Sequence, residues 1–543
     1  MKGGKSQFYT ALSAFLVLRA FAFTYFSGNY TDSDQCVIWQ MAADFAQFDF
    51  RTPFYYGQHY SSGLEAWLAA PFIWLGLPVY RAVPLTTALM STLPWIWMSQ
   101  LSIKKHQNYR SAAALLVLSL LFPVEWLQTT YISRGFMQSV FLISLATRIV
   151  GHSAMRLTVS IFLVGWGLLQ NVNGLLMLPA VFPFWRDAMG DAIKHRPISQ
   201  LLLKSMSGLA LVMCTYLLLN HFKLSHPETK IHPTVELNQS WEALWNNLSN
   251  VNALFQHTYP TAFAIVGVAI IAGATYFLFK PASNLEKAIY LSAILLPFGL
   301  FGIEKMGDGT ENIFFGYGRY FLAIPFAWGF IWANNELKIP PYKNIQPPKW
   351  LFTVLCLLGT SLYSYQFWDK TSLNKFGHSY IPVMVYPMNQ LKQDAETLAS
   401  LCKTDTIGAV IIMGHYILDC GSMGYPLVAN FPSQSHLYPN DTTPEVFKID
   451  RPIPIIRPQF ERRTWLLQEL KEQHYIPRKV AVMDVFKNKS WADSLQIPYT
   501  MADVRGPVYI FRTGDLSLTD FIFHTLSNSP SSVYSGKYPP VKQ

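Results

Sequence analysis

The apolar segment FYTALSAFLVLRAFAFTYF, residues 8–26, and the acidic stretch Tyr30-Thr31-Asp32-Ser33-Asp34-Gln35 that follows it decide the fold. The apolar segment is long enough to cross a bilayer as a helix. Lys2 and Lys5 give it a basic start, and no small-residue cleavage site follows. We therefore expect a retained membrane anchor rather than a removed signal peptide, with two acids just beyond its far end.

The composition points to a membrane protein that crosses the bilayer many times. The chain has 543 residues, of which 51% are hydrophobic and only 14% are charged, whereas soluble domains carry about 25% charged residues. A mean hydropathy of only +0.20 requires a large polar part as well, and the last third supplies it. The net charge of +10 lies in short loops between apolar runs, which is typical of topology signals and not of a nucleic-acid-binding face.

Apolar runs of membrane-spanning length recur over the first two thirds of the chain. The stretch 157–185 is too long for one span, and Gln170-Asn171-Val172-Asn173-Gly174 interrupts it, so we expect two short helices joined by a polar turn there. With these two, the sequence predicts about eleven crossings. The other nine are expected at 8–26, 83–101, 111–128, 134–150, 198–220, 260–279, 288–303, 319–335 and 350–367.

Residues 64–80 are the ambiguous run, because Pro71, Gly76 and Pro78 break it. The basic loops, such as the one containing Lys104 and Lys105, share the side of the N-terminus only if 64–80 does not cross. We therefore interpret it as an amphipathic helix lying on the outer face. The N-terminus is then cytoplasmic, in the inner (plasma) membrane of a cell. The segments 27–82, 221–259, 304–318 and everything after 367 then face outward.

The chain divides into two predicted domains. Residues 1–367 form the polytopic α-helical membrane domain, with 27–82 as its functional outer loop. Residues 368–543 contain no span and form a small extracytoplasmic α/β domain, with a disordered tail from 528. Helices are expected at 395–401 and 462–473, and strands at 407–413, 479–485 and 507–511. Cys402 and Cys420 could form a disulfide in an oxidising compartment, which the sequence leaves open.

The first outer loop carries the candidate chemistry. Asp32 and Asp34 precede Phe54-Tyr55-Tyr56-Gly57-Gln58-His59-Tyr60. Aromatic and polar side chains of this kind suit stacking on sugar rings, and they equally suit an aromatic belt at a membrane interface. A carboxylate at this place can act as a general base towards an acceptor hydroxyl, or it can be a solvated helix end.

A cation stands at the outer end of a later span, in Gly316-Tyr317-Gly318-Arg319-Tyr320. Arg319 is either a clamp for a phosphate group or an ordinary interfacial side chain. His59 and Arg134 are weaker candidates for this role. No metal site is predicted, because neither the cysteines nor the histidines have the tight spacing of metal ligands.

Several segments in order resemble the GT-C superfamily of membrane glycosyltransferases. They are FYYGQHYSSGLEAWLAAPF, VYRAVPLTTAL, SRGFMQSVFLISLATRI, GWGLLQNVNGLLMLPAVF and GRYFLAIPFAW. The nearest branch is that of bacterial proteins similar to family 39, related to protein O-mannosyltransferases and aminoarabinose transferases. The resemblance covers residues 8–335 well and the tail poorly.

The resemblance implies a polyprenyl-phosphate-sugar donor and an inverting transfer on the outer face. It places the catalytic acid at Asp34. Gln35 stands where a second acid is often found, so a divalent metal is possible but not required. The Lys-Pro-Pro segment of the aminoarabinose branch is replaced by Ser61-Ser62-Gly63, which gives Arg319 more weight as the phosphate ligand. The candidate substrate-binding residues are Asp32, His59, Tyr60, Glu65, Arg319 and Tyr320.

The sequence therefore predicts an integral-membrane glycosyltransferase that moves a sugar from a polyprenyl-phosphate donor to a hydroxyl on a glycan, lipid or protein. Two alternatives stay open: a transporter or flippase of a lipid-linked saccharide, and a non-catalytic assembly subunit. A transporter is expected to carry functional charge deep within its spans. The sequence has few such residues, and the best of them, Glu125, lies near the end of a span.

Overall fold

The fold is described from a computed structural model of the chain. The residues that the structure describes are 2–27, 29–31, 33–50, 52–55, 59, 61–119, 127, 130–133, 135, 137–149, 154–195, 197–226, 240–242, 284–301, 323–334, 349–372, 386–387, 401, 407–413, 446–448, 452–456, 476–484, 492–493, 495–503, 507–518 and 520–521. They fall into two compact units. The larger unit comprises Met1–Asn29 and Asp44–Val385, and the smaller comprises Tyr30–Ala43 and Tyr386–Gln543.

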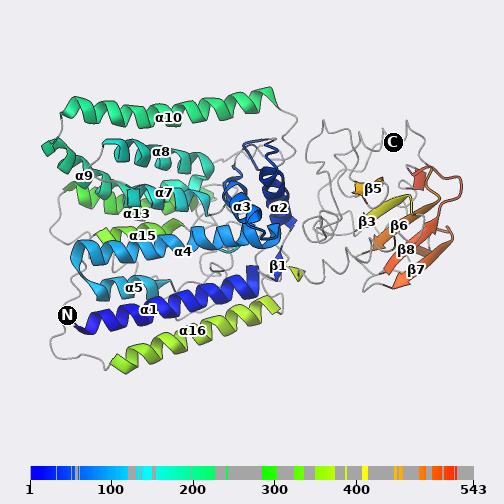
Figure 1. Ribbon diagram of the computed structural model, residues 1–543, viewed down its shortest axis with the longest axis horizontal. Helices are drawn as coiled ribbons and strands as arrows, with labels where there is room; N and C mark the ends of the chain where they lie inside the picture. The colour runs from blue at the N-terminus through cyan, green and yellow to red at the C-terminus, as the bar shows by residue number, and fades with distance from the viewer. Residues whose placement is uncertain are drawn as a thin grey trace. The chain divides into compact units, whose positions relative to one another are not determined.

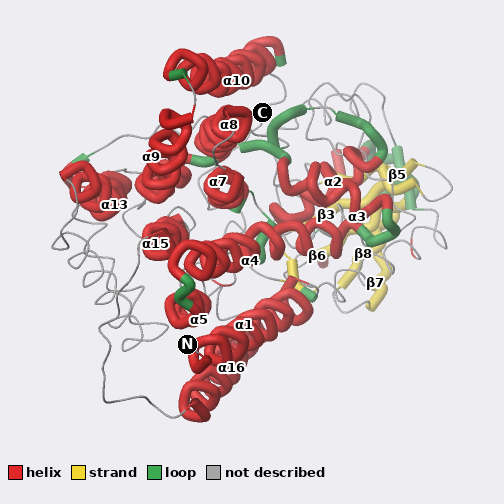
Figure 2. Tube along the Cα trace, turned by 60° about the vertical axis from the view of Figure 1, so that its left-hand side comes forward, coloured by secondary structure: helices red, strands yellow, loops and turns green. Residues whose placement is uncertain are grey.

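The larger unit is helical, and its long helices lie side by side (Figure 1). A central helix, α7, contacts α4, α8, α9 and a short 3-10 helix, η2, and Figure 2 shows it among α4, α8, α9 and α15. The elements are α1 (Lys2–Phe21), the π-helical turn η1 (Ala22–Ser27), α3 (Leu64–Trp74), α4 (Val79–His106), α5 (Tyr109–Leu118), α7 (Gln138–Ile149), α8 (Ala154–Gln170), η2 (Val172–Met177), α9 (Leu178–His195), α10 (Ile198–Ser225), α13 (Asn284–Phe301), α15 (Ala323–Asn334) and α16 (Lys349–Ser372).

The helices stand where the apolar runs predict them. The polar interruption at 170–174 behaves as expected: α8 ends at Gln170, and the Asn171 side chain accepts from the Asn173 N–H to cap η2. The predicted span at 260–279 lies outside the described residues. The number of crossings stays a prediction.

Two of the helices that the structure describes are long and apolar enough to cross a membrane by length and composition. They are Gly4–Ser27 and Ile198–Ser225, and three shorter apolar helices run over Leu64–Trp74, Gln138–Ile149 and Met155–Gln170. At 11 residues, α3 is about 16 Å long, against a hydrocarbon core of about 30 Å. Its length therefore agrees with the prediction that 64–80 does not cross.

The crossing of α8 and α10 depends on glycine. A Cβ atom on Gly165 of α8 would lie 2.3 Å from Cγ2 of Val212, and one on Gly208 of α10 would lie 2.9 Å from the backbone oxygen of Thr158. The Thr158 hydroxyl also donates to the backbone oxygen of Lys204 at 2.9 Å. The two helices therefore touch backbone to backbone, a contact that small residues permit.

The smaller unit is built on a six-stranded mixed sheet in the order β4-β5-β3-β6-β8-β7. The three central strands, β5, β3 and β6, are parallel, and β4, β8 and β7 pair antiparallel at the two edges. A separate two-stranded ladder joins β1 to β2. The strands are β1 (Tyr30–Thr31), β2 (Tyr386–Pro387), β3 (Ala409–Met413), β4 (Val446–Lys448), β5 (Pro452–Ile456), β6 (Lys479–Asp484), β7 (Tyr499–Asp503) and β8 (Pro507–Arg512).

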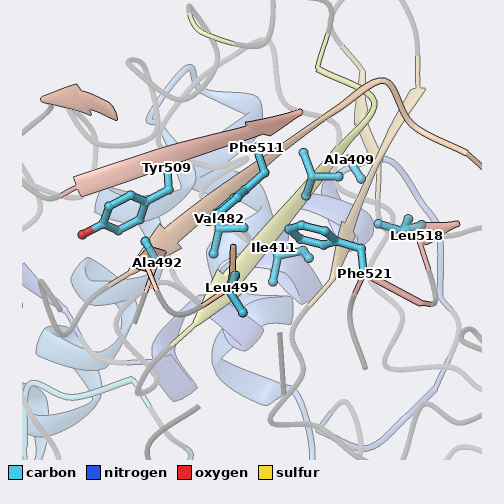
Figure 3. Packing of buried hydrophobic residues seen from close by; sticks show 10 residues of the cluster. Ala409, Ile411, Val482, Ala492, Leu495, Tyr509, Phe511, Leu518 and Phe521 are labelled. Atoms are coloured by element: carbon cyan, nitrogen blue, oxygen red, sulfur yellow. The ribbon is translucent and has the colours of Figure 1, made fainter. Parts of the chain in front are cut away.

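One face of this sheet carries a hydrophobic core (Figure 3). Alternate residues of β3, β6 and β8 point into it, as the two-residue period of a strand requires. The core consists of Ala409, Ile411, Val480, Val482, Ala492, Leu495, Tyr509, Phe511, Leu518 and Phe521.

The strands predicted at 407–413, 479–485 and 507–511 agree with β3, β6 and β8, whereas β4, β5 and β7 were not predicted. The predicted helix at 462–473, the disordered tail, Cys402 and Cys420 lie outside the described residues. The same holds for the predicted helix at 395–401, except Leu401. The assignment of domains to 1–367 and 368–543 stays a prediction.

Candidate functional site

The acid that the sequence predicts as the general base lies at the start of a helix. Asp34 is the second residue of α2 (Ser33–Ala46), and its side chain lies outside what the structure describes. The helix macrodipole stabilises a carboxylate at a helix N-terminus. An acid at this position can therefore serve simply to stabilise the helix. Gln35, at the position of the expected second acid, is buried. Asp32 lies outside the described residues.

The two ends of the segment 54–62, here called the aromatic loop, pair with each other. Phe54 and Ser62 form an antiparallel bridge, and the Tyr55 N–H donates to the backbone oxygen of Ser61 at 2.7 Å. The His59 ring is half-buried, with its centroid 5.5 Å from that of Phe54. Tyr60 lies outside the described residues.

The aromatic loop is held on one side by the end of α10. The ammonium group of Lys223 lies 5.1 Å from the centroid of the Phe54 ring, within the range of a cation–π contact. The Phe222 ring lies 6.1 Å from Phe54 and stacks on His226 at 4.4 Å. These contacts place aromatic and cationic groups of α10 beside Phe54, at the start of the loop.

The base of the loop is fixed by two amide side chains. Gln138 of α7 donates through Nε2 to the backbone oxygen of Ser62 at 2.9 Å and accepts from the Ser62 hydroxyl at 3.3 Å. Gln170, the last residue of α8, accepts from the Ser62 N–H at 3.1 Å. Gln138 is fully buried and Gln170 is 2% exposed, so these bonds form in a site closed to water.

Glu65, expected to bind substrate, is fully buried in the first turn of α3. Its Oε2 accepts from the Gly135 N–H at 2.7 Å, and its Oε1 accepts from the Thr87 hydroxyl at 3.1 Å. The Thr87 hydroxyl lies 2.8 Å from that of Ser133. Both carboxylate oxygens are thus occupied by the protein, and a direct contact of Glu65 with substrate stays a prediction.

Burial raises the pKa of Glu65 to about 7, because removal from water disfavours the carboxylate. The hydrogen bonds from Gly135, Thr87 and Gln138 oppose this shift and lower the pKa, but they do not cancel it. Glu65 therefore titrates near neutral pH.

Any other residue at position 135 would force its surroundings to shift. Its φ is +78°, and a Cβ atom there would lie 2.9 Å from the Ser61 hydroxyl oxygen and 3.3 Å from Nε2 of Gln138. A left-handed backbone and a close approach to the aromatic loop both require glycine here.

Sequence reasoning missed Thr87, Ser133, Gly135 and Gln138 as members of this polar cluster. The signal was present, because SRGFMQS places polar residues at the start of an otherwise apolar helix. Of the other predicted site residues, Arg319, Tyr320 and Arg134 lie outside the described residues. Within the part of the chain that the structure describes, no group of three His, Cys, Asp or Glu side chains could hold a metal ion.

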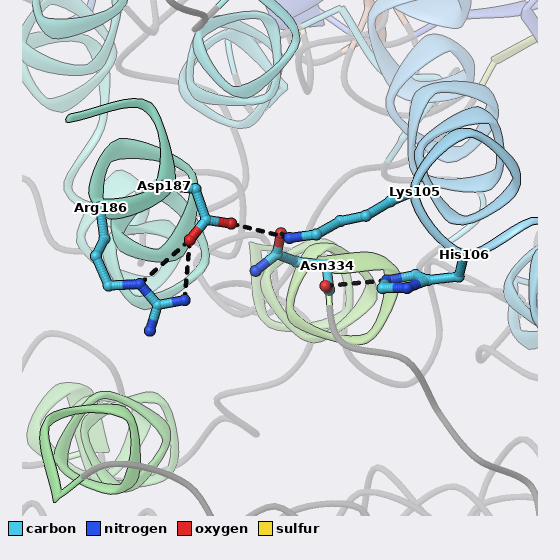
Figure 4. A network of polar contacts seen from close by, with 5 residues as sticks. All are labelled: Lys105, His106, Arg186, Asp187 and Asn334. Atoms are coloured by element: carbon cyan, nitrogen blue, oxygen red, sulfur yellow. Dashed lines mark hydrogen bonds and ion pairs between the residues drawn. The ribbon is translucent and has the colours of Figure 1, made fainter. Parts of the chain in front are cut away.

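A second polar network ties three helices together elsewhere in the larger unit (Figure 4). Lys105 of α4 donates to Asp187 of α9 at 2.9 Å and to the Asn334 side chain of α15 at 2.8 Å. His106 lies 3.1 Å from the backbone oxygen of Asn334, and Arg186 donates twice to Asp187.

Burial alone would raise the pKa of Asp187, but the hydrogen bonds and charges of Lys105 and Arg186 lower it below its ordinary value. Because these groups are more than a third exposed, the network joins helices rather than forming a buried reactive centre.

The solved structures that resemble this chain include two of one bacterial protein and one of an archaeal protein. ArnT from Cupriavidus metallidurans bound to undecaprenyl phosphate matches with a TM-score of 0.50 at 13% sequence identity, over 94% of this chain and 98% of that chain. The same protein in the apo state matches with a TM-score of 0.49 at 13% identity, over 94% and 98%. The archaeal oligosaccharyltransferase AglB from Archaeoglobus fulgidus, in complex with an inhibitory peptide and a dolichol-phosphate, matches with a TM-score of 0.41 at 13% identity, over 94% and 75%. No family model and no curated protein matches the chain.

Proposed function

We propose that this chain, a polytopic membrane protein with the GT-C fold, is an inverting glycosyltransferase. It would transfer a sugar from a polyprenyl-phosphate donor to a hydroxyl group of a glycan, lipid or protein at the extracytoplasmic face. The observation that carries this proposal is the fold likeness to ArnT bound to undecaprenyl phosphate, which extends over nearly the whole of both chains.

Each step of the reaction has a candidate group. The acceptor hydroxyl attacks the anomeric carbon while Asp34 takes its proton, and the bond from that carbon to the phosphate oxygen breaks. Arg319 stabilises the negative charge on the departing lipid phosphate. His59 and Tyr60 hold the donor sugar, and Asp32 and Tyr320 are further substrate contacts. The C-terminal domain shapes the acceptor site.

The aromatic loop gives this assignment its physical support. Its bridge and its two amide anchors hold Phe54 and Ser62 together, and the His59 ring lies beside Phe54. A preorganised frame of this kind lowers the entropy lost when a sugar ring is held for attack.

The test uses purified protein in lipid nanodiscs or proteoliposomes with a polyprenyl-phosphate sugar. A transferase releases polyprenyl phosphate and glycosylated acceptor. A flippase moves intact donor across the vesicle membrane without cleaving it, and an assembly subunit does neither. Either of the last two results would overturn the proposal.

A further inference from the structure

The carboxylate of Glu65 is enclosed by groups that come from three separate parts of the chain. Thr87 belongs to α4, Gly135 precedes α7, and Gln138 is the first residue of α7. Each of these groups is a neutral hydrogen-bond donor to the carboxylate. A buried carboxylate is costly unless its lone pairs are occupied, so these bonds fix where the donor groups must lie.

When Glu65 is ionised, the hydroxyl groups around it can donate their hydrogen bonds in only one order. Thr87 has a single proton, and when it donates that proton to Glu65 it must accept from Ser133. The carboxylate thus holds Ser133 through Thr87 and holds Gly135 directly, at 2.7 Å. Two positions in the 133–138 segment are therefore fixed by one side chain.

The same segment supports the aromatic loop. Gln138 exchanges two hydrogen bonds with Ser62, and the Cα of Gly135 faces the Ser61 hydroxyl so closely that no Cβ fits between them. A shift of the 133–138 segment would therefore move Ser61 and Ser62, and with them the bridge to Phe54 that closes the loop.

We infer that Glu65 is a positioning residue: it holds the 133–138 segment against the base of the aromatic loop and so sets the geometry of the loop that binds the donor sugar. The donor-binding role of the loop rests on the proposed function, whereas the clamp itself rests on the contacts alone. Glu65 acts through other groups and does not touch the sugar.

A matched pair of substitutions separates this role from direct substrate binding. In Glu65→Gln, the amide oxygen accepts from Gly135 and the amide nitrogen donates to Thr87, whose proton then turns to Ser133 or to the Val83 backbone oxygen 3.4 Å away. The clamp therefore survives. In Glu65→Ala the bonds from Gly135 and Thr87 to residue 65 are both lost.

We expect Glu65→Ala to raise the KM for the polyprenyl-phosphate sugar by about tenfold or more, the scale of one lost hydrogen bond to a charged group. The acceptor KM should not change, and Glu65→Gln should restore most of the loss. Glu242→Ala, at an exposed glutamate, is the matched control and should behave as wild type. Equal defects in Glu65→Ala and Glu65→Gln would overturn the inference in favour of a carboxylate that contacts substrate.

A second measurement does not depend on the reaction. Hydrogen exchange of the peptide containing residues 133–138 should become faster in Glu65→Ala and stay slow in Glu65→Gln, because the Gly135 N–H is bonded directly to Glu65. Unchanged protection in Glu65→Ala would refute the clamp. If wild type lacks transferase activity but shows this exchange pattern, the proposed function fails and the clamp stands. If Glu65→Ala does not fold, Gln138→Ala should give the same rise in the donor KM, because it removes the bonds that join the segment to Ser62, and a wild-type donor KM there would refute the inference.

Discussion

At the scale of single residues, Glu65 and Asp34 illustrate two different uses of a carboxylate. Glu65 is fully buried and saturated by neutral donors, whereas Asp34 begins a helix. An acid that is fully buried, with both oxygens bonded to groups of the protein, is poorly placed to take a proton from substrate. Asp34 therefore stays our proposed general base.

Asp34→Asn should abolish sugar transfer while expression and donor binding stay close to wild type. The change keeps size and polarity but removes the basic lone pair, and general-base catalysis contributes about 10²- to 10⁴-fold. Turnover and donor binding would be measured on the same purified samples. Asp32→Asn is the paired control and should lose less turnover than Asp34→Asn. Near-normal turnover in Asp34→Asn would show that another group is the base.

The raised pKa of Glu65 predicts how stability depends on pH. The pKa is about 7 in the folded protein against an ordinary value of 4.5, so the folded state binds more protons between these values. The contribution of Glu65 is fully present below about pH 4.5 and is lost as the pH rises through 7. Glu65→Gln lacks this titration.

Between pH 5 and pH 8, the melting temperature of wild type should therefore fall relative to that of Glu65→Gln. Most of this fall should be complete by about pH 7.5, half a unit above the pKa of Glu65. The comparison with Glu65→Gln cancels the other titrating groups. A difference that does not vary with pH would contradict the burial of an ionisable Glu65.

The sequence could identify candidate acids but not their surroundings. Glu65 was predicted as a substrate ligand because it lies in a segment that resembles a family motif. Its partners Thr87 and Gly135 stand 22 and 70 residues away along the chain. Periodicity assigns a residue to a face of a helix and cannot name what lies opposite that face.

At the scale of elements, the sequence predicted more, because each helix and strand depends on a local pattern. The helix break after Gln170 followed from a run of polar residues, and β3, β6 and β8 followed from short apolar runs. The strand β5 escaped notice because it contains Pro452 and Pro454, and proline normally argues against a strand.

The contact between α8 and α10 predicts that Gly208→Ala destabilises the protein by about 1–3 kcal/mol, as overpacking of a tight contact does. The new methyl group would meet the Thr158 backbone oxygen and Cβ of Ile161, both at 2.9 Å, and neither can swing away. Thermal unfolding in detergent would measure the loss. Gly359→Ala in α16 is the control, because nothing lies within 4 Å of its Cβ. A Gly208→Ala protein as stable as this control would mean that the two helices do not pack so closely.

At the scale of the whole molecule, the chain shares its fold with ArnT over nearly the whole length of both chains. Composition and the order of apolar runs were enough for the helical membrane class. Two features depend on contacts between distant segments: the joining of residues 30–43 with the C-terminal unit and the six-stranded order of its sheet. Local sequence patterns do not encode such contacts.

The last prediction concerns topology. If α3 lies on the membrane surface, the basic loops all fall on one side, the N-terminus is cytoplasmic and the C-terminal domain is extracytoplasmic. The exposed side of α3 is apolar, and Trp67, Leu68 and Trp74 on it are 37%, 39% and 55% exposed. Aromatic and aliphatic side chains of this kind suit the headgroup boundary.

The test uses two single-cysteine variants, Lys2→Cys and Ser527→Cys, each in a protein from which the five native cysteines have been removed. Each variant would be treated with a membrane-impermeant maleimide, first in intact spheroplasts and then in lysed ones. Only the cysteine at position 527 should react in intact spheroplasts, and both should react after lysis. An odd number of crossings requires this asymmetry, so labelling of both positions from the same side would exclude eleven spans. It would also make α3 or the division of the 157–185 stretch into two crossings the first assignment to revise, because these two assignments decide whether the number of crossings is odd.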